Sequence, residues 1–443
     1  MGVTAPLRRL VRGAPARCFA AVGPGGQEEA RWLRLAPEIT VSDGPRAADV
    51  LLCVAVEGAA LIEAVAATHD AMPRPRGVVA WWPLGGRPPG WPFPDAVVVR
   101  EATELPAAAV RVRNELLDGV RLSSPDVLPD VDPAPWRGVG PFGQGGSGMT
   151  GGVPYGRPLA ERAEDRDGLK LDQLLVRVGP FLPPWPPGLL LDVRIQGDVI
   201  QSVSLPETTS SEARGTLSTS AAGDEDVFVA ALTRPMPLAE LELARARSHL
   251  AALAEALRTS GLVALARRVL QLAADVRPSD RDRLARLERR LRRDGTLSWA
   301  TGGVGRVSND RARLLPAGPV ARASGDHRDA RSSDPSYVDL GFSPILDRGG
   351  DSAARWRVRL AEARQSLALA GRAGKTLTTL TGSVEGPQGT LDATGSPISS
   401  LVALLLELLP GQEWGDAVTT MVSLDIPAVP PGEAQALPEE RDR

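Results

Sequence analysis

The sequence is poor in the residues that bind metal ions: of its 443 residues, two are cysteines and three are histidines. Cys18 and Cys53 cannot form the disulfide framework of a secreted protein. They also cannot supply the four thiolates of a structural zinc site, a 4Fe–4S cluster or a nickel–iron centre. The histidines are His69, His249 and His327. The composition therefore argues against a metal site within this chain.

The sequence also lacks an excess of charge of one sign and any long hydrophobic run. Its 51 basic and 54 acidic residues leave a net charge of -3, so it has no surplus of positive charge to neutralise phosphates, and a nucleic-acid partner is not expected. The sequence contains no run of eighteen apolar residues, so it predicts no membrane span. The first residues lack the apolar stretch of a signal peptide. We therefore expect a cytoplasmic protein.

Glycine and proline, in contrast, are abundant, with 46 and 40 residues, and they concentrate in a few stretches. Residues 123–168 form the clearest of these stretches, and we interpret them as a linker or long loop. Gly143, Gly145 and Gly148 match the pattern G-x-G-x-x-G. The phosphate site of that motif needs a strand before it and a helix after it, and neither is predicted here. A flexible or groove-lying loop is the favoured interpretation.

The first part of the chain has the pattern of a parallel α/β sheet. Short apolar runs at 48–56, 77–82 and 96–99 read as buried strands. Helical spacing appears between the first two runs, at 61–69, and after the third, at 107–117. This alternation predicts a small α/β domain over residues 1–122.

The later part of the chain reads as mostly helical with a small antiparallel sheet, which makes the fold α+β overall. Period-two alternation around Gly197-Asp198 predicts a β-hairpin within 189–205. Helical patterns follow, with Ser279 and Ser352 as expected N-caps of two of the helices. We expect four parts: an α/β domain at 1–122, a linker at 123–168, a helical domain at 169–426 and a disordered tail at 427–443.

Two clusters of polar residues are candidates for a site. Glu242, Arg245 and His249 share one helical face, and residues 318–331 hold a dense set of opposite charges. Such clusters either line a polar pocket or form buried ion pairs that hold helices together, and the sequence leaves both alternatives open. The candidate pocket-lining residues are His249, Arg322, Arg328, Asp329 and Arg331.

Several motifs in the later part resemble a known family. They include Arg322-Ala-Ser-Gly325, Asp329-Ala-Arg331, Asp334-Pro335-Ser336-Tyr337 and Gly349-Gly350-Asp351. In this order they resemble the large, quinone-site subunit of respiratory complex I, which is related to the large subunit of group 4 nickel–iron hydrogenases. Residues 42–52 and 72–80 are similar to the small subunit of the same complexes, which bears an iron–sulfur cluster. The chain thus resembles a fusion of the two subunits.

The metal ligands of that family are lost in this sequence. The small subunit of the family holds its cluster with four cysteines; Cys18 falls at the position of the first and is its remnant, whereas Ala21 stands at the second. The resemblance also places a histidine at the tip of a hairpin, where this chain has Leu182. We therefore expect a degenerate iron–sulfur site, no metal and no cofactor bound by this chain alone. Quinone and NAD binding are implied only by the resemblance.

These observations predict a cluster-less or non-catalytic subunit with a structural or coupling role. Its setting would be a complex I-like assembly, an NADH–quinone oxidoreductase or a hydrogenase relative, peripheral to the cytoplasmic membrane and partnered by other subunits including a membrane subunit. An alternative is an active quinone-dependent oxidoreductase subunit that receives electrons from a partner's cofactor. A third hypothesis is a free-standing binder of a small molecule in a cavity between the domains. No catalytic residue is identified by the sequence.

Overall fold

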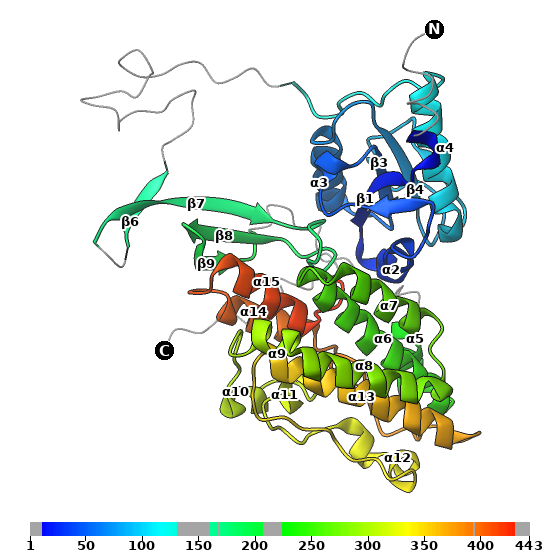
Figure 1. Cartoon of the computed structure of the whole chain (residues 1–443), viewed down its shortest axis with the longest axis vertical. Coiled ribbons are helices and arrows are strands. Elements are labelled where there is room, and N and C mark those ends of the chain that lie inside the picture. The colour runs from blue at the N-terminus through cyan, green and yellow to red at the C-terminus, as the bar shows by residue number, and fades with distance from the viewer. Residues whose placement is uncertain (1–10, 131–159, 166–167, 207–223, 393–394, 430–443) are drawn as a thin grey trace.

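The computed structural model describes residues 11–130, 160–165, 168–206, 224–392 and 395–429. The glycine motif at 143–148 and residues 430–443 of the expected tail lie outside these ranges. An N-terminal α/β region lies above a largely helical region, and an antiparallel sheet extends to the side of the helices (Figure 1). The predicted fold class is confirmed.

The N-terminal region (residues 11–130) contains a five-stranded sheet in the order β2-β1-β3-β4-β5. Every neighbouring pair is parallel. The strands are β1 (Ala16–Val22), β2 (Ile39–Val41), β3 (Val50–Val54), β4 (Gly77–Trp81) and β5 (Val97–Val98). The helices are α2 (Gln27–Leu33), α3 (Ala59–Asp70) and α4 (Leu105–Asp118). The three strands predicted at the apolar runs are present as β3, β4 and β5, and the two predicted helices are present as α3 and α4.

Strand β3 shows why the sheet is covered on both faces. All five of its residues are buried, and they alternate between two apolar clusters. Val50, Leu52 and Val54 pack in the cluster that includes residues of α4, whereas Leu51 and Cys53 pack in the cluster that includes residues of α3. A strand buried on both faces reads as a continuous apolar run, which is the signal that the sequence showed.

Residues 123–128 begin the expected linker, yet they are held against the N-terminal region. The amides of Val127 and Leu128 donate to the carboxylate of Asp70 at 3.1 and 2.8 Å. The amide of Ser124 donates to the Arg76 carbonyl at 2.9 Å. The division of the chain into four parts stays a prediction, because these contacts show only where the described part of the linker lies.

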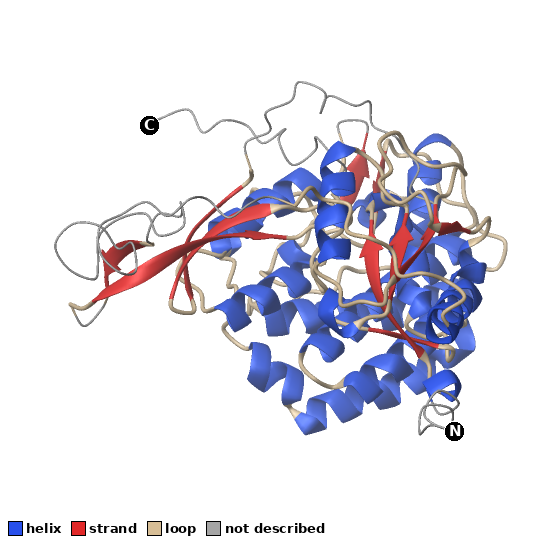
Figure 2. Cartoon of the chain, turned by 90° about the horizontal axis from the view of Figure 1, so that it is seen from above, coloured by secondary structure: helices blue, strands red, loops and turns tan. Residues whose placement is uncertain are grey.

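The four-stranded antiparallel sheet has the order β6-β7-β8-β9. Its strands are β6 (Glu161–Glu164), β7 (Lys170–Val178), β8 (Leu191–Gln196) and β9 (Val199–Ser204). The predicted hairpin is present, because β8 and β9 pair around Gly197, which has a φ of 62°. This sheet reaches outward from the helices in both views (Figures 1 and 2).

The helical region (residues 224–429) is organised around two long helices, α6 and α13, that pack against each other. The helices of this region are α5 (Asp224–Thr233), α6 (Leu238–Thr259), α7 (Val263–Ala274), α8 (Arg281–Asp294), α9 (Thr296–Thr301), α10 (Asn309–Arg313), α11 (Pro319–Arg322), α12 (Pro335–Asp339), α13 (Ser352–Ala373), α14 (Ile398–Leu408) and α15 (Trp414–Leu424). Strands β10 (Ser383–Glu385) and β11 (Thr390–Asp392) form a short hairpin. No helix in the described ranges is long and apolar enough to cross a membrane.

Two expected helix caps were wrong by one residue. Helix α13 is capped by Asp351 and not by Ser352, because the Asp351 carboxylate accepts the amide of Ala354 at 2.8 Å. Ser279 lies in a short 3-10 turn, and the N-cap of α8 is Asp280. The side chain of Ser352 instead donates to the Val304 carbonyl at 3.0 Å, so this residue joins the helix start to the preceding loop.

Candidate functional site

The dense charges of the sequence form a buried network centred on Arg322. Its Nε lies 2.7 Å from Glu362 Oε1, and its Nη1 lies 2.5 Å from Glu385 Oε1 and 2.9 Å from Asp329 Oδ2. All four side chains are fully buried. Burial disfavours the charged carboxylate, but the attraction of Arg322 outweighs it and holds the pKa of Glu362 well below its ordinary value. Glu362 is therefore ionised in the folded protein.

The network continues through Arg331 and Glu242. Arg331 makes a two-pronged contact with Asp329, with Nε at 2.9 Å and Nη2 at 2.8 Å from the two carboxylate oxygens. Glu242 on α6 accepts Arg245 Nε at 3.0 Å and the Tyr337 hydroxyl at 2.8 Å. These bonds join α6 to the segment around residues 329–337, so the charges hold distant parts of the helical region together.

His249 connects α6 to α13 within the same network. Its Nε2 lies 3.1 Å from Glu362 Oε2, and both side chains are fully buried. The ionised carboxylate accepts this hydrogen bond, so the proton of the neutral ring is on Nε2. Nδ1 is buried and has no hydrogen-bond partner among the described residues. Burial lowers the pKa of His249, although the hydrogen bond with Glu362 opposes that shift, and the ring stays neutral.

The structure thus brings four of the five candidate residues together: His249, Arg322, Asp329 and Arg331. Arg328 lies at the edge, where its side chain is 44% exposed and pairs with Asp326. Its Nη2 also donates to the Leu315 carbonyl at 2.9 Å. Of the two alternatives that the sequence left open, buried ion pairs describe this geometry. Glu362 and Glu385 complete the network, and no local spacing marks them as its members.

The two cysteines lie inside the parallel sheet. Cys18 is the third residue of β1, and Cys53 is in β3. Their side chains pack in two different apolar clusters. Burial raises the pKa of the Cys18 thiol to about 12 and raises the pKa of Cys53 as well. Both thiols are therefore protonated and surrounded by apolar side chains of the sheet.

The residues present therefore do not fit an iron–sulfur cluster. Ligand sites of parallel sheets form beyond the carboxyl ends of the strands, whereas Cys18 pairs with Val50 in the body of the sheet. Among the described residues, no group of three or more histidine, cysteine, aspartate or glutamate side chains is placed to hold a metal ion.

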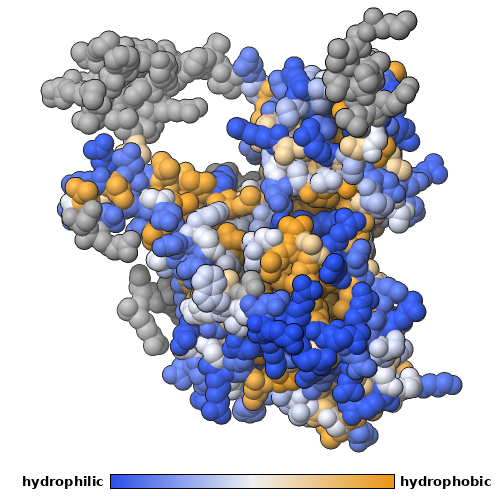
Figure 3. Space-filling view, viewed as in Figure 1, coloured by the Kyte–Doolittle hydropathy of each residue, from blue (hydrophilic) through white to orange (hydrophobic). Residues whose placement is uncertain are grey.

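A separate pocket of about 370 Å³ lies between the N-terminal region and the helical region. The N-terminal region contributes residues of β1, α2 and β2 to its lining. The opposite wall comes from α6, α7 and the end of α15, and the loop 180–187 after β7 closes one side. Figure 3 shows an apolar area between the two regions with polar side chains around it. None of the five candidate residues lines this pocket.

The loop 180–187 gives the pocket a stiff apolar wall. It contains five prolines, and Trp185 in it stacks nearly parallel on Trp414, with ring centroids 6.1 Å apart. Gly179 precedes the loop with a φ of 94°, and a side chain there would meet the Leu189 carbonyl. The loop is therefore held in place at its start, by the close packing at Gly179, and at Trp185, by the stacking on Trp414.

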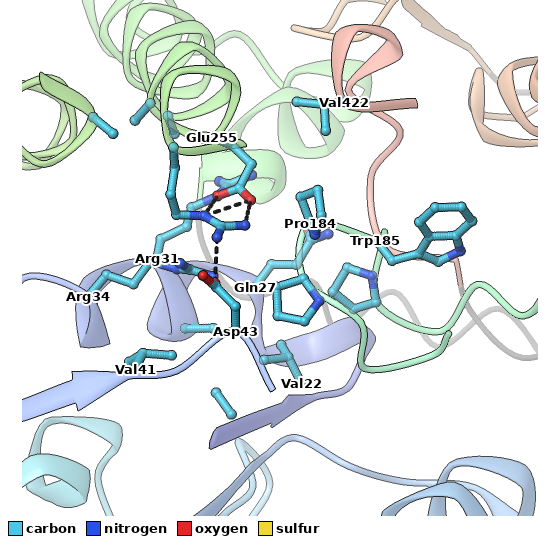
Figure 4. Close-up of a pocket in the computed structure, with 18 of the residues that line it drawn as sticks. Val22, Gln27, Arg31, Arg34, Val41, Asp43, Pro184, Trp185, Glu255 and Val422 are labelled. Carbon is cyan, nitrogen blue, oxygen red and sulfur yellow. Dashed lines mark hydrogen bonds and ion pairs between the residues drawn. The ribbon is translucent and has the colours of Figure 1, made fainter. Parts of the chain in front are cut away.

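Charged residues gather at the other side of the pocket. Glu255 and Arg258 on α6 form a close ion pair, and Asp43 joins Arg258 from the N-terminal region at 2.5 Å (Figure 4). Arg31 of α2 and Arg34, the C-cap of that helix, also line the pocket near Glu255 (Figure 4). Sequence reasoning missed these residues. Their one local signal is the i, i+3 spacing of the two arginines, which places both on one face of the chain at the end of α2.

The comparisons with known proteins concern mainly the helical region. Residues 258–393 match the family model described as the 49 kDa subunit of respiratory-chain NADH dehydrogenase. This segment is similar to a complex I subunit. It contains Arg322, Asp329, Arg331, Glu362 and Glu385, whereas His249 and Glu242 precede it. The resemblance of the N-terminal region to the small subunit stays a prediction.

One solved structure that is similar comes from the membrane-bound sulfane sulfur reductase, an archaeal respiratory membrane complex. The match has 16% identity and a TM-score of 0.43, and it covers 59% of this chain and 98% of the other. No curated protein matches the sequence.

Proposed function

We propose that the chain is a peripheral subunit of a complex I-like respiratory assembly and that its role is structural or coupling. The similarity of residues 258–393 to the 49 kDa subunit supports the setting. The observation that carries the proposed role is the position of the two thiols, which lie buried within the parallel sheet with raised pKa values. A chain without four available thiolates cannot hold the cluster that would relay electrons through it.

The buried charge network fits a structural role. It links α6, α11, α13 and β10 through His249, Arg322, Glu362 and Glu385. Its carboxylates and guanidiniums are largely satisfied by one another, so they fix the relative positions of these elements. An element that moved would leave a charge buried without its partner, and the network therefore favours one rigid arrangement.

The first experiment measures iron and acid-labile sulfide in the purified full-length chain. We expect less than one iron per chain, because the two cysteines cannot hold a cluster. Four irons per chain would overturn the proposal. A pull-down from native membranes with mass spectrometry tests the setting, and the expected partners are redox subunits together with a membrane subunit. Recovery of the chain alone would contradict membership of an assembly.

A second candidate function is quinone-dependent oxidoreduction with electrons from a partner's cofactor. The apolar pocket between the two regions favours it, because an aromatic and proline-rich wall suits the ring of a quinone. The test is quinone reduction by the reconstituted complex with Leu182→Trp, which narrows the pocket at a residue that is 39% exposed. Loss of reduction with an intact assembly would favour this candidate. Arg322→Ala is unsuitable, because Arg322 is buried and its loss would report on folding.

A further inference from the structure

The charged side of the pocket has more positive than negative groups. Four arginines and three carboxylates line the pocket; Asp43 and Glu255 lie on the charged side, whereas Asp425 lies near the end of α15 and pairs with Arg359 outside the lining. Arg258 is engaged with both carboxylates of the charged side, and Arg267 donates to the Leu35 carbonyl at 3.2 Å. The other two arginines are Arg31 and Arg34. The lining therefore has a formal excess of positive charge.

Arg31 and Arg34 are the two guanidiniums of the pocket that have room for a ligand. In the described part of the chain, neither side chain forms a hydrogen bond or an ion pair, although both interact electrostatically with Glu255. Burial lowers the pKa of Arg34, and the attraction of Glu255 opposes that shift. A half-buried guanidinium with unused donors gains from an anion that accepts them.

The rest of the pocket is mainly apolar and suits a hydrocarbon chain, and the charge of Asp425, which also lines it, is paired with Arg359 at 3.1 Å. Its walls are alanines of α6, the proline loop 180–187 and the side chains of Met421, Val422 and Ile426. Figure 4 shows Pro184 and Trp185 across the pocket from Arg34, so the apolar wall and the arginines are at different ends. The volume of about 370 Å³ is within the range of pockets for small molecules, roughly 300–1,000 Å³.

We propose that this pocket binds a long-chain carboxylate, with its acid group between Arg31 and Arg34 and its chain along the proline loop. A guanidinium matches a carboxylate with two parallel hydrogen bonds, which makes the arginines a specific recognition element. A neutral molecule of the same size would occupy the apolar wall but leave both guanidiniums without an acceptor. The pocket should therefore bind acids more tightly than neutral quinones or alcohols of the same size, so this inference competes with the quinone candidate for the same pocket.

The experiment is titration calorimetry of the full-length chain with three probes: dodecanoate, dodecanol and the neutral quinone decylubiquinone. Dodecanoate should bind at least about tenfold more tightly than either neutral probe, because only it engages the arginines. Arg31→Gln and Arg34→Gln should each weaken dodecanoate binding by about tenfold or more and leave dodecanol binding unchanged. Arg46→Gln is the matched control, since Arg46 is exposed, lies in the same region and does not line the pocket.

The site is located by dodecanoate that carries a photoreactive diazirine at its methyl end, which should label peptides covering 180–187 or 421–426. The inference is overturned if dodecanoate does not bind, if the neutral probes bind as tightly, if the arginine variants with native circular dichroism bind normally, or if the label is found elsewhere. These outcomes are independent of the iron content and the pull-down, so the inference and the proposed function fail separately.

Discussion

Arg322 illustrates how single residues decide the stability of the helical region. Its guanidinium contacts three buried carboxylates, from Asp329, Glu362 and Glu385. Removing a charge from water costs several kcal/mol, and the attraction of the partner recovers it only while the pair is complete. Loss of Arg322 should therefore cost more stability than loss of the partner of an exposed carboxylate, because the three buried carboxylates would remain without their cation.

Arg322→Met should lower the free energy of unfolding by about 3–5 kcal/mol, because it leaves buried carboxylates without their cation. Urea denaturation followed by circular dichroism measures the change. Arg177→Met is the control: Arg177 pairs with Asp192 at the surface, with 61% of its side chain exposed, and its loss should cost less than about 1 kcal/mol. Equal effects of the two substitutions would contradict the role of burial.

His249 should make stability depend on pH in a defined window. The pKa of His249 is below its ordinary value of 6.5 in the folded protein, chiefly because of burial. The unfolded chain thus takes up this proton below about pH 6.5 while the folded chain does not. The contribution of His249 to the free energy of unfolding is therefore complete above pH 6.5, and it is lost as the pH falls towards the pKa of His249 in the folded protein.

Urea midpoints at pH 7, 6 and 5 measure this effect, with a slope of up to about 1.4 kcal/mol per pH unit from one proton. His249→Gln should flatten the slope in this window. The exposed His327→Gln serves as the control and should keep the slope of the natural protein. A slope that is the same with and without His249 would show that the histidine does not titrate in this way.

At the scale of elements, the turn from β1 to α2 depends on a close approach of two backbones. The Gly23 amide donates to the Val54 carbonyl at 2.8 Å at the end of β3. A Cβ on Gly23 would lie 1.9 Å from the Ala55 carbonyl oxygen, closer than any two such atoms can approach. The turn also places α2, and with it Arg31 and Arg34, at the edge of the pocket. Both the packing of the turn and the position of α2 at the pocket therefore require a glycine at position 23.

Gly23→Ala should destabilise the protein by about 1–3 kcal/mol or more, because the added methyl group must displace backbone atoms. The measurement is the urea midpoint, read from tryptophan fluorescence. Gly44→Ala is the matched control: Gly44 lies in the same region and has an extended φ of -156°, and no atom of the described residues lies within 4 Å of the added Cβ. A loss of stability confined to Gly44→Ala would contradict this account.

Some elements escaped prediction for reasons of tertiary context. The apolar runs of β3 and β4 are evident because a strand covered on both faces needs apolar side chains throughout. Strand β1 was missed, because its alanines and Arg17 have little preference for strands, and it forms between β2 and β3 through pairing. Helix α15 also carried no clear start signal, since Glu413 at its N-cap makes no side-chain cap hydrogen bond.

At the scale of the whole molecule, the pocket is made by two regions and belongs to neither alone. The ion pair between Arg258 and Asp43 and the bond from Arg267 to the Leu35 carbonyl connect the regions at the pocket. Arg258 and Asp43 are exposed in part, so their pair alone contributes little stability. A ligand that touches both walls would therefore couple the regions more strongly than these contacts do.

Dodecanoate at 100 times its Kd should stabilise the folded chain by about 2.7 kcal/mol through mass action. Because both regions form the site, hydrogen exchange should slow in β1 and α2 as well as in α6 and α7. Mass spectrometry of the exchanged peptides measures this, with Arg34→Gln as the control that should lose the protection. Protection in one region alone would show that the ligand does not bridge the two.

The sequence by itself determined the scarcity of cysteine and histidine and marked several elements, among them β3, β4 and α4, because composition and hydrophobic periodicity are local properties. It also marked Arg322 and His249 as members of polar clusters. Only the tertiary structure decided which groups meet: Arg322 contacts Glu362 40 residues away, and Arg258 contacts Asp43 across 215 residues. Local spacing cannot specify such pairs, since they form where the packing of separate elements brings opposite charges together out of water.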